Sequence, residues 1–347
     1  MTKKLLVIGL FLLGASALPA QDLYIGQFNI RNDNAKDAAA GNGWAVRCPV
    51  VCDILKVESF DIFGTQEVLH NQLEDMLAAL PDYDYVGVGR NDGKTGGEYA
   101  AIFYKSDRIK CLSSGHFWLS QTPEVVGSVG WDAKYTRICT WGQFKDRKTG
   151  KKFWMFNLHM DHRGVEARKQ SALLVMERIR TMCGKQPYIL LGDFNVDQFN
   201  PIYPMMMESG LFVDCHDAAA VRFAPTGSMN YFKTDFKTDS RIDHVLVSDD
   251  FEVLDYTVLT YSYWSEEKPS SEALEAIGAT EHKALYEQFL AVTGIDSLDP
   301  VFRTEDMDAF SRLYELWPWE DFDDAYLSLT PIPDLLEAYI QSNPDAF

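Results

Sequence analysis

Short apolar segments alternate with amphipathic ones along most of the 347-residue chain, and this alternation most limits the possible folds. Between residues 23 and 263 the strand-like segments are rich in β-branched and aromatic residues and follow one another at short intervals. The predicted strands include LYIGQFNI, FDIFGTQEV, YDYVGVGR, EYAAIFY, FWLS, TWGQFKD, KKFWMFNLHM, YILLGDFN and RIDHVLV. Many strands with few helices indicate a layered α/β sandwich.

Two segments between the predicted strands have helical periodicity. They are HNQLEDMLAAL and VEARKQSALLVMERIRTM, and in the second Ala172, Val175 and Ile179 fall on one face. A turn at residues 147–150 is expected to join TWGQFKD to KKFWMFNLHM as a hairpin. We see no internal repeat and no low-complexity segment.

The pattern changes near Ser265. Residues 265–347 carry 19 acidic and 4 basic side chains, a net charge of −15 out of −19 for the whole chain. Segments such as MDAFSRLYELW and PDLLEAYI are helical in period, and strand signals become rare. We therefore predict a strand-rich domain over residues 21–264 and an acidic helical segment over residues 265–347. The charge argument against nucleic acid applies mainly to that segment.

The N-terminus has the features of a secretory signal. Lys3 and Lys4 precede an apolar run from Leu5 to Leu13, which is too short to span a bilayer, and small residues follow as far as Ala20. Residues 1–20 are the predicted signal peptide, so the protein is expected to be exported, to the periplasm or beyond the cell. Six cysteines then permit disulfides, but a chain of this length does not depend on them. No transmembrane segment is expected.

Polar residues end several predicted strands, where apolar ones would be expected. Asparagine, aspartate, glutamate or histidine occurs at or near one end of five strands: Asn29; Glu67; Asn157, His159 and Asp161; Asp193 and Asn195; and Asp243 and His244. If these ends converge, they form an oxygen-rich cation site with an imidazole beside it. Hard oxygen ligands favour Mg²⁺, with Mn²⁺ or Ca²⁺ as alternatives.

Each of these residues also has a purely structural interpretation. Asp193 and Asn195 could cap a turn, because both suit turns and strand ends. His159 could be a hydrogen-bonded core imidazole. His244 should point away from Asp243, because successive side chains of a strand alternate between faces.

The ordered set FN, TQE, NLHMDH, GDFN and RIDH resembles the endonuclease/exonuclease/phosphatase superfamily, whose members include pancreatic deoxyribonuclease, deadenylases and neutral sphingomyelinases. GVGRNDGKTGGEYAAIFY, FWLS and WDAKYTRICTW further resemble a secreted bacterial subgroup. The resemblance covers roughly residues 22–260. It implies a four-layer sandwich of two packed mixed β-sheets flanked by helices. It also implies metal-dependent phosphoester hydrolysis at one edge of that sandwich.

The resemblance also implies roles for individual residues. Glu67 would be the Mg²⁺ ligand, with Asn29 beside it and Asp243 as a further candidate. Asp193 would orient or deprotonate the attacking water, and Asn195 would hold a phosphoryl oxygen. The implied catalytic set is Asp193, Asn195, His159, Asn157 and Asp243. The implied substrate-binding set is Arg90, Glu98, Trp118, Asp161 and Arg168.

The sequence departs from the family pattern at its end. The family normally closes with a strand that opens Ser-Asp-His, whose histidine is a second catalytic imidazole. No such triplet follows Asp243, and the nearest match is Thr280-Glu281-His282 in a segment with helical periodicity. The acidic segment could be inserted before the closing strand or replace it, or the chain could stop short of it.

The expected function is that of an exported, monomeric Mg²⁺-dependent phosphoester hydrolase, with a phosphodiester as the expected substrate. A nuclease would use a basic rim, for which Arg31, Arg90, Arg137, Arg163 and Arg168 are candidates. A lipid or sugar-phosphate hydrolase would use an aromatic rim, for which Trp44, Trp118 and Trp131 are candidates. Nucleic acid is thus a possible partner that the sequence does not settle. The alternative is a binding protein of the same fold that has lost catalysis with the closing histidine.

Overall fold

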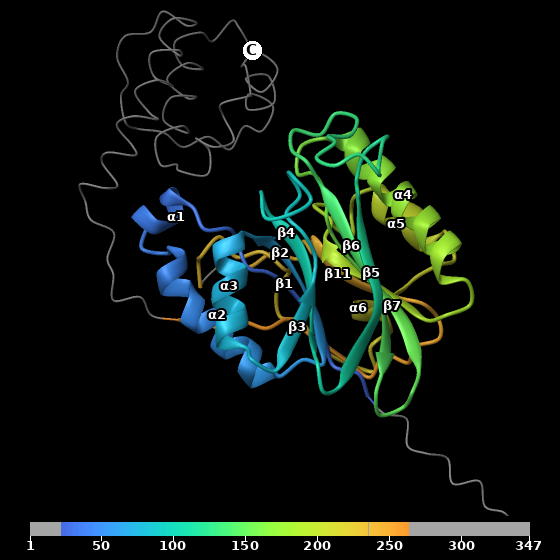
Figure 1. Cartoon of the computed structure of the whole chain (residues 1–347), viewed down its shortest axis with the longest axis horizontal. Coiled ribbons are helices and arrows are strands. Elements are labelled where there is room, and N and C mark those ends of the chain that lie inside the picture. The colour runs from blue at the N-terminus through green and yellow to red at the C-terminus, as the bar shows by residue number, and fades with distance from the viewer. Residues whose placement is uncertain (1–21, 235, 264–347) are drawn as a thin grey trace, which may run out of the picture. The chain divides into compact units, whose positions relative to one another are not determined.

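A computed structural model describes residues 22–234 and 236–263 (Figure 1). Residues 22–33 and 47–263 belong to one compact unit, and residues 34–46 are grouped outside it. The short helix α1 (Ala35–Ala39) lies in that second group and begins at Asn34, whose side chain accepts a hydrogen bond from the backbone N–H of Asp37. The predicted signal peptide and the predicted acidic helical segment lie outside the described residues.

The first sheet of the main unit has four strands in the order β1-β2-β4-β3. The strands are β1 (Ile25–Asn29), β2 (Ile62–Val68), β3 (Tyr83–Val86) and β4 (Tyr99–Lys105). The β1–β2 pair is parallel, as expected for strands joined through the helix α2 (Trp44–Glu58). The other two pairs are antiparallel, and α3 (His70–Ala79) follows β2.

The second sheet has six strands in the order β5-β6-β7-β8-β11-β9. The strands are β5 (Ile109–Trp118), β6 (Ile138–Asp146), β7 (Lys152–His159), β8 (Tyr188–Asp193), β9 (Val213–Asp214) and β11 (Asp243–Val247). Only β7 and β8 run parallel, and α4 (Val165–Cys183) makes the connection between them. The remaining elements are short: α5 (Ile202–Met207), α6 (Cys215–Ala218), and the paired strands β10 (Val221–Phe223) and β12 (Asp255–Thr257).

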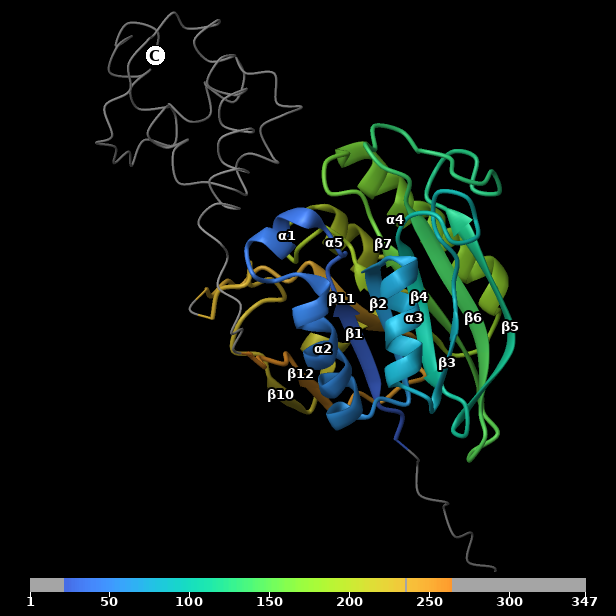
Figure 2. The same ribbon diagram turned by 60° about the vertical axis from the view of Figure 1, so that its left-hand side comes forward.

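Buried apolar side chains lie on both faces of the sheets, because alternate residues of each strand face opposite ways. The inner faces of the two sheets meet through buried side chains such as Ile62, Ile102 and Leu191. The outer face of the second sheet packs Phe156 and Leu158 against α4 and α5. In both ribbon views α2 and α3 cover the first sheet, while α4 lies on the far side of the second (Figures 1 and 2). The prediction of two packed mixed sheets flanked by helices is confirmed.

The extent of one strand differs from the sequence-based expectation. Strand β5 begins at Ile109, whereas only the stretch from Phe117 to Ser120 was expected as a strand. Its earlier part lies at the edge of the sheet and carries exposed serines, so its sequence has no alternation of apolar and polar residues that would predict a strand.

All six cysteines lie within the described residues and are free thiols. No helix of the described part is both long and apolar enough to cross a bilayer.

Candidate active site

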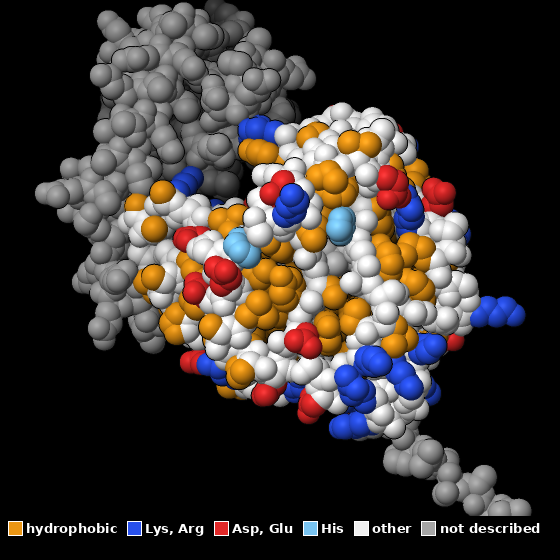
Figure 3. Space-filling model, in the orientation of Figure 1, with side chains coloured by type: hydrophobic (Ala, Val, Ile, Leu, Met, Phe, Trp, Pro, Cys, Tyr) orange, Lys and Arg blue, Asp and Glu red, His pale blue; other side chains and the backbone are white. Residues whose placement is uncertain are grey.

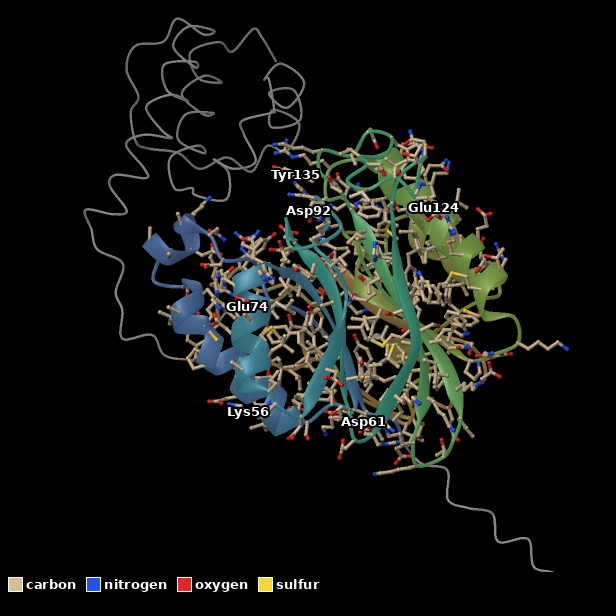
Figure 4. All side chains as sticks on the ribbon, in the orientation of Figure 1. Lys56, Asp61, Glu74, Asp92, Glu124 and Tyr135 are labelled. Atoms are coloured by element: carbon tan, nitrogen blue, oxygen red, sulfur yellow. The ribbon has the colours of Figure 1, made fainter. Side chains whose placement is uncertain are left out.

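The strand register brings most of the predicted site residues to one end of the sandwich. In the first sheet Asn29 at the end of β1 lies opposite Gln66 of β2. In the second sheet Asp193 lies opposite both His159 and Asp243. The start of β2, marked by Asp61, is at the lower end in Figure 4, and the loops carrying Asp92 and Tyr135 are at the other end. The site residues therefore lie at the upper end, where β1, β2 and β8 finish.

Asn29 links carboxylates of the two sheets. Its Nδ2 donates to Glu67 Oε1 at 3.1 Å and to Asp193 Oδ2 at 3.0 Å. Its Oδ1 accepts a hydrogen bond from the backbone N–H of Arg31 at 3.0 Å. Glu67 and Asp193 thus lie on either side of one amide group, as expected if the strand ends converge in one site.

Glu67 occupies a distorted part of β2. The pairing of β2 with β4 shifts register between Thr65 and Val68, and Glu67 has a φ of 61°, which is uncommon for a residue other than glycine. Its Oε2 accepts a hydrogen bond from the backbone N–H of Asn32 at 3.1 Å. Such backbone strain costs about 1–3 kcal/mol and concentrates at functional sites, because the distortion aims a side chain that a regular strand would not.

The last part of β8 depends on a glycine. Gly192 has a φ of +146°, and a Cβ there would lie 2.1 Å from the carbonyl oxygen of Leu158. Past it, Asp193 Oδ1 accepts a hydrogen bond from the backbone N–H of Asn195 at 2.9 Å. The Asn195 side chain donates to the carbonyl of Met160 at 3.0 Å, so its role toward a phosphoryl oxygen stays a prediction.

Burial and mutual repulsion disfavour a negative charge on Glu67, Asp193 and Asp243 at the same time. Burial raises the pKa of Asp193 well above its ordinary value, and the carboxylates of Asp243 and Glu67 raise it further. Burial also raises the pKa of Asp243 to about 6, although hydrogen bonds from Ser228 and Gln27 oppose this effect. A bound cation would relieve the repulsion between these acids.

The ligands present suit Mg²⁺, which keeps several water ligands, better than a metal ion that is coordinated by protein side chains alone. Among the described residues, no three His, Cys, Asp or Glu side chains surround a common metal position. Mg²⁺ is usually held by one or two carboxylates, with water and substrate phosphate completing its shell. The Glu67 carboxylate fits this requirement, so the residues present are compatible with the predicted cofactor. Asn29 would add its Oδ1 only with its amide turned over, because that oxygen accepts from the backbone N–H of Arg31.

The surroundings of His159 favour its neutral form, and both ring nitrogens lie beyond hydrogen-bond distance of the nearby carboxylates of Asp193 and Glu98. Burial lowers its pKa well below the ordinary value, and the positive charges of Arg137 and Arg90 lower it further. Its Nε2 lies 3.8 Å from Asp193 Oδ2, and its Nδ1 lies 3.8 Å from Glu98 Oε2. The Nδ1 atom is buried and has no hydrogen-bond partner among the described residues. His159 can therefore interact with a ligand by hydrogen bonding rather than as a cation.

A crevice too narrow to admit a water molecule lies beside His159. It is lined by Arg90, Glu98, Tyr99, Ala100, Ile138 and His159. Arg90 Nη1 donates to Glu98 Oε2, and Trp118 Nε1 donates to the carbonyl of Arg90 at 2.7 Å. Three residues of the predicted substrate-binding set thus lie together next to the catalytic candidates.

The other predicted substrate-binding residues hold the neighbouring loop. Asp161 Oδ1 accepts hydrogen bonds from the backbone N–H groups of Arg163 and Gly164, and Arg168 Nη1 donates to the carbonyl of Asp161. Burial raises the pKa of Asp161, but the Gly164 and Arg163 hydrogen bonds and the charge of Arg137 outweigh it and hold the pKa below its ordinary value. The roles of Asp161 and Arg168 toward substrate stay predictions.

Asn157 and His244 point elsewhere. Asn157 is fully buried between the sheets, and its Nδ2 donates to the carbonyls of Thr65 and Ala101. Its predicted catalytic role stays a prediction. His244 lies on the opposite face of β11 from Asp243, against the ring of Phe194, and its Nε2 is 2.8 Å from the carbonyl oxygen of Val196.

Sequence reasoning missed Gln27, and it did not assign Gln66 a role. Gln27 Nε2 donates to Asp243 Oδ1 at 3.0 Å, and the Gln27 and Gln66 amides donate to each other at 2.5 and 2.9 Å. The sequence did contain a signal for both residues. Each glutamine occupies an inward-facing position of a mainly apolar strand, where a buried polar side chain needs a hydrogen-bond partner.

Solved structures of other proteins share this fold. A mannosyl-6-phosphatase of Bacteroides thetaiotaomicron is 46% identical, with a TM-score of 0.69, and the match covers 72% of this chain and 96% of that one. An endonuclease/exonuclease/phosphatase family protein of the same organism is 48% identical, with a TM-score of 0.68, over 70% of this chain and 88% of that one. The human Nocturnin catalytic domain shares the fold at 15% identity, with a TM-score of 0.51, over 65% of this chain and 82% of that one.

Curated relatives match over a smaller share. "Uncharacterized protein L388" of Acanthamoeba polyphaga mimivirus is 34% identical over 162 residues, which is 44% of this chain and 60% of that protein. Drosophila melanogaster Nocturnin is 22% identical over 219 residues, which is 56% of this chain and 32% of that protein. This chain therefore spans less than two thirds of either relative.

Two family profiles match successive parts of the sequence. The second, described as DMP19-like protein, matches residues 267–343, within the predicted acidic segment. The first is described as Endonuclease/Exonuclease/phosphatase family and matches residues 26–262, which include every predicted site residue. The chain belongs to the endonuclease/exonuclease/phosphatase family.

Proposed function

We propose that this protein is an exported, divalent-metal-dependent hydrolase of small phosphoesters, with a sugar phosphate as its substrate class. The observation that carries the proposal is the joining of Glu67 and Asp193 through Asn29, with His159 and Asp243 alongside. The sugar-phosphate class is supported by the 46%-identical structure named as a mannosyl-6-phosphatase. It replaces the phosphodiester that the sequence led us to expect.

Each side chain then has a chemical task. Glu67 and Asn29 would hold Mg²⁺, which supplies charge neutralisation at the phosphate when bound. Asp193 accepts a proton from the attacking water, a role suited to a carboxyl whose pKa burial has raised. Neutral His159 hydrogen-bonds a phosphate oxygen or the leaving group, because within the described part of the chain its Nδ1 has no partner.

The distribution of positive charge favours a small substrate over a nucleic acid. Lys and Arg side chains gather at the lower right of the face in Figure 3, where the β6–β7 hairpin ends. Lys152 begins β7 and His159 ends it, so seven residues of strand, roughly 23 Å, separate that turn from the site. This exceeds the Debye length of about 8 Å at physiological salt. Nearer the site, Arg90 is paired with Glu98 and Arg137 with Asp161.

The second candidate function is binding without catalysis. It is favoured by the absence of a Ser-Asp-His triplet after Asp243 in the sequence. Within the described residues, His159 is the imidazole for which an approach to Asp193 is seen. His282 lies outside the described residues, and its role stays a prediction.

The test is hydrolysis of mannose 6-phosphate, an aryl phosphodiester and an oligonucleotide by the full chain. The sugar phosphate should be hydrolysed fastest, and excess EDTA should stop the reaction. Glu67→Gln and Asp193→Asn should each lower kcat at least 100-fold, while Glu74→Gln, at an exposed acid of α3, should not. Binding of a phosphoester with no turnover would favour the second function, and full activity in EDTA would exclude the metal mechanism.

A further inference from the structure

A row of side-chain amides crosses the space between the sheets and ends on Asp243. It starts at Asn157 of β7, whose Nδ2 donates to the backbone carbonyls of Thr65 at 2.9 Å and Ala101 at 2.8 Å. Gly64 of β2 leaves room for this crossing, because a Cβ there would lie 2.9 Å from Asn157 Cγ. Both N–H groups of Asn157 are thus used on the first sheet, and only its Oδ1 remains to face the next amide.

The direction of every later hydrogen bond follows from this start. Asn157 Oδ1 accepts from Gln66 Nε2 at 2.6 Å, and the second Gln66 N–H donates to Gln27 Oε1 at 2.9 Å. Gln66 Oε1 accepts from Gln27 Nε2 at 2.5 Å, which leaves one Gln27 N–H to donate to Asp243 Oδ1 at 3.0 Å. Turning any one amide over would set N–H against N–H or oxygen against oxygen. Two backbone carbonyls therefore determine that a donor meets Asp243.

We propose that Gln27 is a positioning residue for Asp243, and that the amide row of Asn157, Gln66 and Gln27 holds this carboxylate beside Asp193. Asp243 lies directly opposite Asp193 in the β8–β11 ladder, where two like charges favour turning apart. The Gln27 N–H group, which is held by the first sheet, opposes this rotation of the Asp243 carboxylate without adding a charge. The inference rests on the proposed function, since the positioned group belongs to the same site.

The variant Gln27→Met removes the donor and keeps the volume. It should lower kcat for the sugar phosphate about tenfold or more and change KM less than about twofold, because Gln27 acts through Asp243 and not on substrate. The matched control is Gln143→Met on β6, which removes a bond of the same kind, from Gln143 Nε2 to Gln186 Oε1 at 2.9 Å. The control should leave kcat unchanged.

One further measurement separates positioning from a structural role. In an Asp243→Asn background, Gln27→Met should lower the residual kcat less than about twofold, because the group it positions is already altered. The same loss in both backgrounds, or wild-type kcat in Gln27→Met, would overturn the proposal.

If no phosphoester is hydrolysed, the proposed function fails but the amide row can still be judged by NMR. The Gln27 side-chain NH₂ should exchange slowly in the wild type and quickly in Gln66→Met. Fast exchange in the wild type would overturn the amide row itself.

Discussion

Asp243→Asn should stabilise the metal-free protein, although Asp243 belongs to the candidate site. The pKa of this carboxyl is about 6 in the folded protein, against an ordinary value of 3.8. The folded state therefore binds the proton more tightly than the unfolded chain, and stability is lost as the pH rises from about 4 through about 6. The two pKa values differ by about two units, and each unit corresponds to about 1.4 kcal/mol of folding free energy. The ionised carboxylate should thus cost about 3 kcal/mol at pH 8 and almost nothing below pH 4.

The assay is urea unfolding, followed by tryptophan fluorescence in EDTA at pH 4.5 and pH 8. Asparagine keeps the oxygen that accepts from Gln27 but carries no charge, so the variant should be more stable at pH 8 by up to about 3 kcal/mol. The gain should shrink markedly at pH 4.5. Asp53→Asn, at an exposed position of α2, should show no such pH-dependent gain. A variant no more stable than the wild type at pH 8, or a gain independent of pH, would refute the reasoning.

Three further outcomes are expected. Gly192→Ala should destabilise the protein by at least about 3 kcal/mol in urea, because the new Cβ would meet the Leu158 carbonyl. Gly184→Ala should cost less, about 1–3 kcal/mol from its positive φ alone, because nothing lies within 4 Å of its Cβ. Since the pKa of His159 is lowered, the pH profile of kcat/KM between pH 6 and 8 should show no His159 ionisation and keep its shape in His159→Gln; a break near pH 6.5 lost in that variant would contradict this. Deleting residues 266–347, with their net charge of −15, should raise oligonucleotide cleavage at low salt more than at high salt; equal cleavage with and without them would exclude an electrostatic gate.

The sequence was sufficient to place the residues whose neighbours are in the same strand. Asp193 follows a buried apolar run and a glycine, so its position at a strand end could be predicted without a structure. The alternation of β11 likewise put His244 and Asp243 on opposite faces. The local sequence pattern, a strand end or the alternation of side chains along a strand, determines these positions, and the structure agrees with the prediction.

Partners that lie far apart in sequence could not be predicted in this way. The bond between Gln27 and Asp243 joins residues 216 positions apart, and it depends on how the two sheets pack. The positive φ of Glu67 depends on a shift of pairing with β4, which no local propensity encodes. Short elements such as α6 and β9 were missed because two to four residues carry too little periodicity.

The wide spacing of the site along the chain has a kinetic consequence. Asn29 bonds to Asp193 across 164 positions, so the site exists only after both sheets have formed and docked. Closing such long loops costs entropy before any contact offsets it, and chains rich in distant contacts fold slowly. Assembly of the site should therefore be among the last steps of folding. The emergence of activity during refolding would then report completion of the whole sandwich, and a partly folded chain would hold the acids apart.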